Sequence, residues 1–386
     1  MIATRFEFPP TELPDSIQEL RREVRAFIAE ERSNGAVPRP GNSGMRVSLD
    51  FTRKLAQRGW IGMTWPKKYG GHERSALERY AVTEELLSAG APVRLHWSPD
   101  RQTGPLLLKF GTEAQKLRYL PGIAKGECIF SIGLSEPNSG SDLAALQTRA
   151  QRVEGGWSVS GTKLWNSNGH NAHYMITLCR TEAQDVDRHR GISQLIVDLK
   201  APGVTIRPII NLAGEHDFNE VVLDGVFVPD ESVLGELGNG WNQASAELAY
   251  ERSGPERWLS AFRLLAELTE ALGRQASVHA CRQLGKWFAH LLTLRQMSQS
   301  IAVMLESGSA PNLEAAIVKD LGTNFEQEMV RSARDLIHAE GIDIQERWRL
   351  VGELLDHAQM WSMIYTVRGG AKEIMRGVIA RGLGLR

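Results

Sequence analysis

Hydrophobic residues in the first third of the chain recur three and four positions apart, which is the period of an amphipathic helix. The segments IQELRREVRAFIAEE (residues 17–31) and ERYAVTEELLSAG (residues 78–90) show this period most clearly. Between them, GWIGMTWPKKYGG (residues 59–71) gathers Gly, Pro and aromatic residues, which are typical of a loop. Residues 1–126 are therefore expected to form an N-terminal helical domain.

Near residue 127 the pattern changes to short, β-branched runs in which apolar and polar residues alternate. Turn signals such as VEGGW (residues 153–157) separate these runs. The runs are WSVSGTKLWNS (157–167), YMITLCR (174–180), SQLIVDL (193–199), VTIRPII (204–210) and EVVLDGVFV (220–228). Because no helix-length segment lies between them, residues 127–236 are expected to form an antiparallel sheet or small barrel.

After residue 237 the period returns to that of helices, and the helices are long. Three segments show this period: residues 241–272, 280–305 and 313–339. A last helix follows near residues 370–381. Long amphipathic helices joined by short links indicate a bundle, so residues 237–386 are expected to form a C-terminal, four-helix-bundle-like domain. The fold class predicted for the whole chain is α+β, in the order helical, β, helical.

The composition narrows the class of protein. A chain of 386 residues, 42% apolar and 24% charged, is globular and long enough for several domains. Its net charge of −1 provides no basic surface for nucleic acid. Three widely spaced cysteines, the absence of an apolar signal segment at the N-terminus and the absence of an 18-residue apolar run favour a cytoplasmic protein without a membrane span.

Common cofactor motifs are missing from the sequence. GELGNGW (residues 235–241) contains glycines, but it follows a loop and lacks the spacing of a dinucleotide-binding turn. No HxxxH, HExxH or Cys/His cluster offers ligands for a metal ion, so no metal site is predicted.

Two polar segments in the β region stand out. LSEPNSGSD (residues 134–142) and LWNSNG (residues 164–169) each follow or end a predicted strand. Together they supply hydroxyls, backbone N–H groups and a Trp, which suit a planar ligand rich in hydrogen-bonding groups. From the spacing alone, two ordinary hairpin loops explain them equally well.

The same segments carry a resemblance to a known family. IFSIGLSEPNSGSDLAAL (129–146) and GWSVSGTKLWNSNGHNAHYM (156–175) resemble the TEPxxGSD-type and WxTN-type signatures of the acyl-CoA dehydrogenases. Other stretches resemble family segments in the same order: residues 59–71, 104–127, 218–241 and 369–386. The family's architecture, helical domain, β domain and helical bundle, agrees with the pattern described above.

The resemblance implies a non-covalently bound FAD beside both polar segments. It places the loop from Ile132 through Leu134 to Ser135 along the isoalloxazine edge, with Ser135 in place of the usual Thr. Trp165 is expected to pack on the flavin, and Ser167 to donate a hydrogen bond to flavin N5. Ser141 corresponds to a serine that contacts the acyl-CoA. Further positions that the resemblance assigns to the cofactor are Arg282, Ala371 and Glu373.

Members of this family carry their catalytic glutamate at one of two positions, and the resemblance implies the less common position for this chain. The commonest members carry a glutamate in a YEGT-like motif near the C-terminus, where this chain has Gly369. Isovaleryl- and long-chain-type members instead place the glutamate before an arginine on the first helix after the β domain, where this chain has Glu251 and Arg252. The resemblance thus implies Glu251 as base, the Gly369 N–H as oxyanion donor and Arg252 beside the substrate. Glu247 and Glu256 are rivals for the base.

Several departures bear on the adenosine half of the cofactor site. The family's RxxFG motif appears here as CRQLGK, with Arg282 one place out of register and Leu284 in place of Phe. A Gln-x-x-Gly-Gly segment that a neighbouring subunit contributes appears as DLIHAEG, so that an acidic Asp335 stands in place of Gln. An acidic group near a pyrophosphate is unfavourable.

The predicted function is FAD-dependent α,β-dehydrogenation of an acyl-CoA thioester to the 2-enoyl-CoA. Electron-transferring flavoprotein is the expected electron acceptor, and the chain is expected in a homotetramer or in a heterotetramer with a related chain. Two alternatives stay open: a subunit that completes the FAD site of a hetero-oligomeric acyl-CoA dehydrogenase, and a flavin oxidase or monooxygenase on the same fold. The length and branching of the acyl group cannot be inferred from the sequence.

Overall fold

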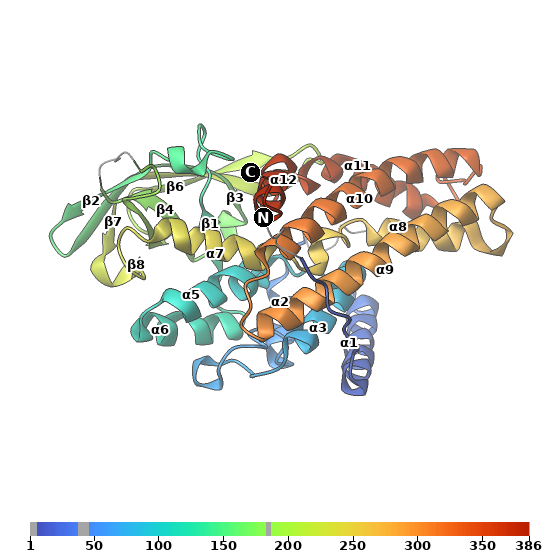
Figure 1. Cartoon of the computed structure of the whole chain (residues 1–386), viewed down its shortest axis with the longest axis horizontal. Helices are drawn as coiled ribbons and strands as arrows, with labels where there is room; N and C mark the ends of the chain where they lie inside the picture. Colours follow the sequence, from blue (N-terminus) through green and yellow to red (C-terminus); the bar gives the residue numbers. More distant parts are fainter. Residues whose placement is uncertain (1–5, 38–45, 183–186, 386) are drawn as a thin grey trace. The chain divides into compact units, whose positions relative to one another are not determined.

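The computed structural model describes residues 6–37, 46–182 and 187–385; the side chains of residues 247–251 and of Gln275 lie outside this description. The chain forms two compact units, each treated below by itself (Figure 1). Unit 1 comprises Met1–Arg46, Arg74–Val93 and Arg252–Arg386. Unit 2 comprises Val47–Glu73 and Arg94–Glu251.

Unit 2 is organised around one sheet. Its strands are β1 (Phe130–Gly133), β2 (Arg149–Val153), β3 (Gly156–Ser167), β4 (Tyr174–Arg180), β5 (Ile192–Asp198), β6 (Val204–Ile210), β7 (His216–Pro229) and β8 (Val233–Leu234). Their order is β6-β7-β3-β2-β4-β5-β8, with β1 paired to β4. The predicted strands are confirmed, and most neighbours are antiparallel as expected.

Two strand pairs differ from the predicted antiparallel pattern, because β1 and β2 both run parallel to β4. A parallel pair needs a long connection between its strands, and the β2–β3 hairpin supplies this connection between β1 and β4. The pairing of β1 with β4 places the segment after Gly133 at the same end of the sheet as Thr177.

Besides α7 (Gly240–Arg252), whose Ala244 is buried against strand residues Leu178 and Ile192, unit 2 contains further helices, of which α5 (Gly104–Phe110) and α6 (Glu113–Ala124) pack on the sheet. Further helices are α2 (Leu49–Gln57) and α4 (Arg94–Ser98), with a π-turn at Pro99–Thr103 and short 3-10 turns at Lys67–Tyr69, Leu143–Ala145, Gly169–Asn171 and Asp230–Ser232. A capping box of Thr112 and Gln115 starts α6. Leu107 and Leu120 share one buried cluster with Phe130, Ile176 and Ile196 of the strands. Burial of this apolar face fixes β1 in the sheet.

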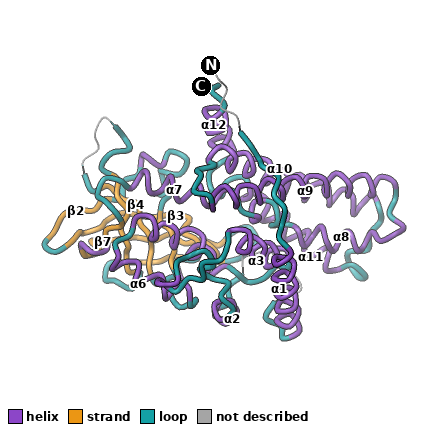
Figure 2. The backbone as a smooth tube through the Cα atoms, turned by 60° about the horizontal axis from the view of Figure 1, so that its bottom comes forward, coloured by secondary structure: helices purple, strands orange, loops and turns teal. Residues whose placement is uncertain are grey.

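Unit 1 is helical. It contains α1 (Asp15–Ser33), α3 (Ala76–Ser88), α8 (Phe262–Leu272), α9 (Val278–Glu306), α10 (Asn312–Ala339), α11 (Arg349–Tyr365) and α12 (Lys372–Gly382), with 3-10 turns at Pro255–Arg257 and Gly273–Gln275. Figure 2 shows α9 and α10, the longest of these, side by side. The C-terminal helical bundle is confirmed in this unit.

The segment of residues 241–272, expected as one long helix, is broken. α7 (Gly240–Arg252) ends at Arg252, and a 3-10 turn at Pro255–Arg257 precedes α8. Pro255 has no N–H to donate to the preceding turn, and the residue before a proline avoids the helical region. The amphipathic period continues across the break, so it did not reveal the break.

A buried ionic cluster connects three helices of unit 1. Glu84 and Glu85 of α3 accept from Arg21 of α1, and Glu85 also accepts from Arg25 at 2.7 Å. Arg295 of α9 donates to Glu84 at 2.8 Å. Because every carboxylate of the cluster faces an arginine, the charges can stay buried.

Candidate functional site

The two polar segments singled out in the sequence lie side by side at one end of the sheet in unit 2. The Leu164 N–H donates to the Ser135 carbonyl at 2.9 Å. The Asn166 side-chain amide donates to the Ile132 carbonyl at 2.9 Å. Residues 132–135 and 164–167 are therefore joined into one surface.

A buried ion pair supports this surface from the inside. Lys163 Nζ lies 2.8 Å from Glu136 Oε1 and donates to the Leu134 carbonyl at 3.1 Å. Glu136 also accepts the backbone N–H groups of Gln147 and Thr148, at 2.6 and 2.9 Å. Burial opposes ionisation of Glu136, but the Lys163 charge and the hydrogen bonds outweigh it and lower the pKa of this carboxyl.

The carbonyls of Ile132, Leu134 and Ser135 are thus all occupied by donors of the protein itself. The half-buried Ser135 and Ser167 have hydroxyls without a hydrogen-bond partner among the described residues. Trp165 is 56% exposed, although a large indole is usually buried, and its ring meets Phe218 edge-on with centroids 5.9 Å apart. Its φ of 60° is a strained value for a residue with a Cβ. An exposed aromatic ring on the same surface as two hydroxyls without protein partners fits a planar, hydrogen-bonding group such as an isoalloxazine ring.

A histidine pair supports the Trp165–Ser167 segment. Asn219 donates to the Asn166 carbonyl at 3.0 Å, and its side-chain oxygen lies 3.2 Å from His170 Nδ1 and 2.8 Å from His216 Nε2. The two imidazole rings stack with centroids 3.8 Å apart. Burial and the neighbouring His216 lower the pKa of His170. Sequence reasoning missed this cluster, because scattered histidines carry no spacing signal.

The serine expected at the substrate, Ser141, is exposed in the loop after β1. Its neighbour Asp142 accepts twice from Arg188 at 2.7 Å, and the Asp142 carbonyl accepts from the Ser139 hydroxyl at 2.9 Å. The loop is therefore held on both sides of Ser141 while the Ser141 hydroxyl stays accessible.

In unit 1, Gly369 and Gly370 form a turn between α11 and α12. Their φ values are 72° and 103°, in the left-handed region that favours glycine. Arg252 Nε donates to the Gly369 carbonyl at 3.2 Å. The contact found for Arg252 is therefore with this turn, and its predicted role at the substrate stays a prediction.

Among the three candidate bases, Glu251 and Glu247 belong to α7, but their side chains lie outside the described residues. The Glu256 carboxylate is buried, 3.8 Å from Arg257. A carboxylate that already faces a cation is a poorer acceptor for a substrate proton than one without such a partner. Glu251 as base stays a prediction.

The residues expected at the adenosine half are all in unit 1. Arg282 is exposed on α9. Ala371 precedes α12, and Glu373 lies exposed in its first turn. Asp335 is exposed on α10, where Arg334 donates to its carboxylate at 3.1 Å. Partial neutralisation by Arg334 reduces the unfavourable charge of Asp335.

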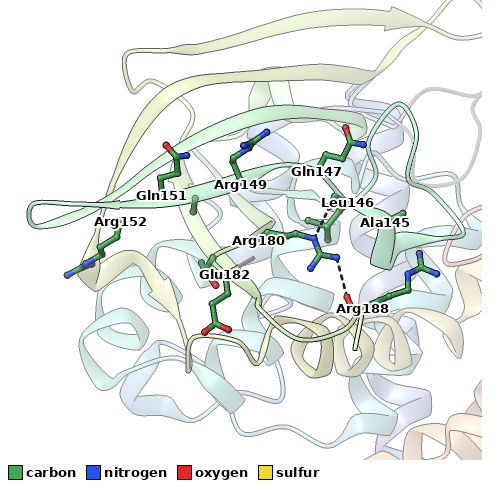
Figure 3. A pocket seen from close by; sticks show the side chains of 11 residues that line it. Ala145, Leu146, Gln147, Arg149, Gln151, Arg152, Arg180, Glu182 and Arg188 are labelled. Carbon is green, nitrogen blue, oxygen red and sulfur yellow. Dashed lines mark hydrogen bonds between the residues drawn. The ribbon is translucent and has the colours of Figure 1, made fainter. Parts of the chain in front are cut away.

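A surface concavity of 1110 Å³ in unit 2 lies beside β2 and the end of β4 (Figure 3). Arginines dominate its lining, but protein acceptors occupy three of them. Arg180 donates to the carbonyls of Leu146 and Arg188 (Figure 3), and also to the Ala144 carbonyl. Arg188 pairs with Asp142, and Arg152 pairs with Asp230. The concavity is thus not built as an anion site.

Two classes of feature are absent from the part of the chain that the structure describes. No group of three His, Cys, Asp or Glu residues there is arranged to hold a metal ion. No helix there has both the length and the apolar character needed to cross a membrane.

Comparison with known families accounts for this arrangement. Three family profiles match in succession: the acyl-CoA dehydrogenase N-terminal domain at residues 14–127, the middle domain at residues 131–226 and the C-terminal domain at residues 238–384. The chain is a member of the acyl-CoA dehydrogenase family, an oxidoreductase class of flavoproteins. The resemblance drawn from the sequence and the predicted fold class are both confirmed.

The chain is also similar to individual proteins of this family. The chain is 31% identical to acyl-CoA dehydrogenase IpdE1 of Mycobacterium tuberculosis, over 96% of this chain and 98% of that protein. It is 33% identical to acyl-CoA dehydrogenase FadE34 of the same organism over 85% of this chain, which spans 45% of that longer protein. A solved structure described as the Tcur3481-Tcur3483 steroid ACAD has a TM-score of 0.84 at 29% identity, covering 97% of this chain and 98% of the other. The ChsE4-ChsE5 complex of M. tuberculosis gives 0.82 at 29% identity, covering 98% and 99%.

Proposed function

We propose that the protein dehydrogenates an acyl-CoA thioester to the 2-enoyl-CoA with bound FAD. One observation carries this proposal within the family. The two flavin signatures form one surface in which the carbonyls of Ile132, Leu134 and Ser135 are bonded within the protein, the Ser135 and Ser167 hydroxyls have no partner among the described residues, and the Trp165 indole is exposed. This donor set suits the polar edge and the face of an isoalloxazine ring.

In this proposal, FAD supplies the hydride acceptor for the substrate β-carbon. Ile132 and Leu134 would provide backbone contacts along the ring edge, and Ser135 and Ser167 would provide hydroxyls. Trp165 would cover a ring face. The Lys163–Glu136 pair would hold the loop in place without touching the ring, because its groups are already committed to protein partners.

Glu251 is proposed as the base that removes the α-proton. A carboxylate near an apolar acyl chain is desolvated, which raises its pKa and makes it a stronger base. The Gly369 N–H is proposed to donate to the thioester carbonyl as negative charge builds on that oxygen. The glycine at 369 leaves no carboxylate at the other family position, which supports Glu251.

The substrate is proposed to be a CoA thioester of a bulky or ring-bearing acyl group. The support is the likeness to the structure described as a steroid ACAD, at 29% identity. Two of the similar structures contain two named chains each, which supports a heterotetramer with a related chain over a homotetramer. Electron-transferring flavoprotein is proposed as the electron acceptor.

The test is anaerobic bleaching of the bound flavin by a panel of acyl-CoA thioesters, from short straight chains to a sterol side-chain thioester. We expect bleaching with at least one thioester, fastest with the ring-bearing one. Protein that carries flavin but bleaches with none of the panel, alone or with its related chain, would contradict the proposed reaction.

A second function, as a subunit that supplies only part of each FAD site and needs a related partner chain to hold flavin, is favoured by one observation. Asp335 is exposed with its carboxylate next to Arg334, at the position where the family has a neutral residue near the pyrophosphate. Flavin content decides between the two. Purified single chain with one FAD per protomer supports the first function, and flavin found only after co-expression with a related chain supports the second.

A further inference from the structure

The turn at Thr366–Ala371 in unit 1 is held by cationic side chains through four backbone carbonyls. Lys319 Nζ donates to the Thr366 carbonyl at 3.0 Å and to the Gly370 carbonyl at 2.5 Å. Arg257 Nη1 donates to the Arg368 carbonyl at 3.3 Å. Arg252 Nε donates to the Gly369 carbonyl. Four of the five consecutive residues from Thr366 to Gly370 thus present their carbonyls to cations.

Two of these cations are fully withdrawn from water. Lys319, on α10, is 0% exposed, and Arg257, in the 3-10 turn before α8, is 1% exposed. Burying a charge is unfavourable unless hydrogen bonds compensate for it. Neutral donors would be enough to fix the shape of a turn. The Glu256 carboxylate, 3.8 Å from Arg257, compensates part of the Arg257 charge, but the groups that hold the turn are still cations and not neutral donors.

The peptide geometry shows where that charge acts. The Arg368 carbonyl and the Gly369 N–H belong to the same planar peptide unit. A cation on the carbonyl oxygen draws electron density from the nitrogen and makes the N–H a stronger donor, which is the cooperative effect seen in chains of hydrogen bonds. Arg257 therefore polarises the Gly369 N–H, and Arg252 polarises the Gly370 N–H in the same way.

The side chain of Arg368 fixes the same peptide from the other side. Its Nη2 donates to the Glu256 carbonyl at 2.7 Å, to the Ser260 hydroxyl at 2.6 Å and to Glu326 at 2.9 Å. Glu326 is 0% exposed and also accepts the Ser260 N–H at 2.6 Å. The residue whose carbonyl receives Arg257 is thus anchored at both backbone and side chain. This leaves the Gly369 N–H little freedom to turn.

We propose that Arg257 and Lys319 are positioning residues for oxyanion stabilisation: they hold the Gly369–Gly370 turn and strengthen the Gly369 N–H as a donor to the thioester carbonyl. This inference rests on the proposed function and adds that the positive charges of Arg257 and Lys319 strengthen the Gly369 N–H donor. Neither side chain touches the reacting atoms in this account. A strongly polarised N–H suits an oxygen that gains negative charge during the reaction.

The test is the carbonyl stretching frequency of a bound enoyl-CoA labelled with ¹³C at the thioester carbon, measured by isotope-edited infrared spectroscopy. In the wild type we expect a lowered frequency relative to the free thioester. Arg257→Gln keeps a neutral donor and removes the charge. It should lose a large part of that lowering and slow flavin reduction at saturating substrate about tenfold, a fraction of the ~10²–10³-fold that removing an oxyanion donor costs.

Rescue and control variants separate polarisation from structure. Arg257→Lys restores the charge and should recover most of the frequency shift. Arg263→Met removes an arginine of the same unit that pairs with Glu267 on its own helix, and it should leave the shift unchanged. Thioester binding should change less than about threefold in Arg257→Gln, because the effect falls on kcat.

The outcomes distinguish this inference from the proposed function. A wild type whose flavin no thioester bleaches would count against the proposed function. A wild type that is bleached, together with an Arg257→Gln variant of wild-type carbonyl frequency, would overturn the inference alone. Should Arg257→Gln fail to fold, Lys319→Gln carries the same expectation, and an unchanged frequency in that variant overturns the inference equally.

Discussion

Removing the Lys163 ammonium tests whether the buried ion pair supports the flavin surface. In Lys163→Met, the Glu136 carboxylate loses its cation while staying buried, and the Leu134 carbonyl loses its donor. At 2.8 Å the pair attracts by about 6 kcal/mol for an effective dielectric constant near 20. Part of this offsets desolvation, so we expect the free energy of unfolding to fall by about 3–5 kcal/mol.

The assay is urea unfolding of the flavin-loaded and flavin-free protein. A second variant, Lys163→Met with Glu136→Gln, removes the uncompensated charge. The Gln147 and Thr148 N–H groups bond different oxygens of the Glu136 carboxylate, and the single oxygen of the replacing amide can accept only one of them. The double variant should therefore regain part of the lost stability, because the uncompensated buried charge is gone. Flavin retention should stay weakened in both variants, because both release Leu134.

The same pair sets a pH dependence. Glu136 has a lower pKa in the folded protein than in the unfolded chain, so its contribution to stability is complete above the unfolded value of 4.5. It is lost as the pH falls through the folded value. The Lys163→Met, Glu136→Gln variant should therefore lose less stability than the wild type between neutral pH and the acid range. An ordinary hydrogen bond contributes about 1 kcal/mol. A free energy of unfolding of Lys163→Met within about 1 kcal/mol of the wild-type value would therefore refute the role of the pair. A Lys163→Met, Glu136→Gln variant no more stable than Lys163→Met would refute it equally.

Three further predictions concern the flavin surface, the base and the turn. Glu251→Gln should retain flavin and thioester binding but slow flavin reduction by about 10²–10⁴-fold in stopped-flow assays, whereas Glu247→Gln should reduce flavin at nearly the wild-type rate. Equal rates for the two variants would contradict the assignment of Glu251 as base. Trp165→Ala should weaken flavin retention about tenfold on dilution, because one aromatic contact is worth about 0.5–1.5 kcal/mol. The control Phe227→Ala removes a similarly exposed aromatic ring on β7 and should leave flavin retention unchanged. Loss of flavin in both variants would indicate general loosening of the sheet. Gly370→Ala should lower the free energy of unfolding by about 1–3 kcal/mol, because its φ is 103° and the new Cβ would lie 2.9 Å from Met375 Cε. The control Gly285→Ala, on α9 with open space around it, should raise the free energy of unfolding by up to about 1 kcal/mol, measured by thermal unfolding. A Gly370→Ala variant as stable as the wild type would contradict the strain at this position.

The sequence predicted the parts of the molecule that depend on local pattern. The run YMITLCR became β4 at Tyr174–Arg180, because alternation and β-branching mark a strand wherever it pairs. The two polar segments were found for the same reason, since their turn residues follow strands directly. The break at Ser253–Pro255 was missed because the apolar period runs through it, although Pro255 was a visible signal.

What the sequence could not provide was the partner of each polar group across the fold. Lys163 and Glu136 are 27 positions apart, and Lys319 and Gly370 are 51 apart. No period or motif links such residues, because their pairing arises only when strands and helices pack. The hydrogen bond from Arg257 to the Arg368 carbonyl, 111 positions away, was equally invisible to pattern reasoning.

The left-handed backbone at Gly369 also limits how this chain could change over evolutionary time. A glutamate at position 369, the commoner place for the family's base, would have to adopt a φ near 72°, which costs an L-residue about 1–2 kcal/mol. The Arg252 and Arg257 contacts hold the flanking carbonyls in that geometry. A lineage that carries this turn would need to rebuild its backbone before a carboxylate there gave any benefit. The order of substitutions is therefore constrained: a glutamate at position 369 would become favourable only after the turn has relaxed.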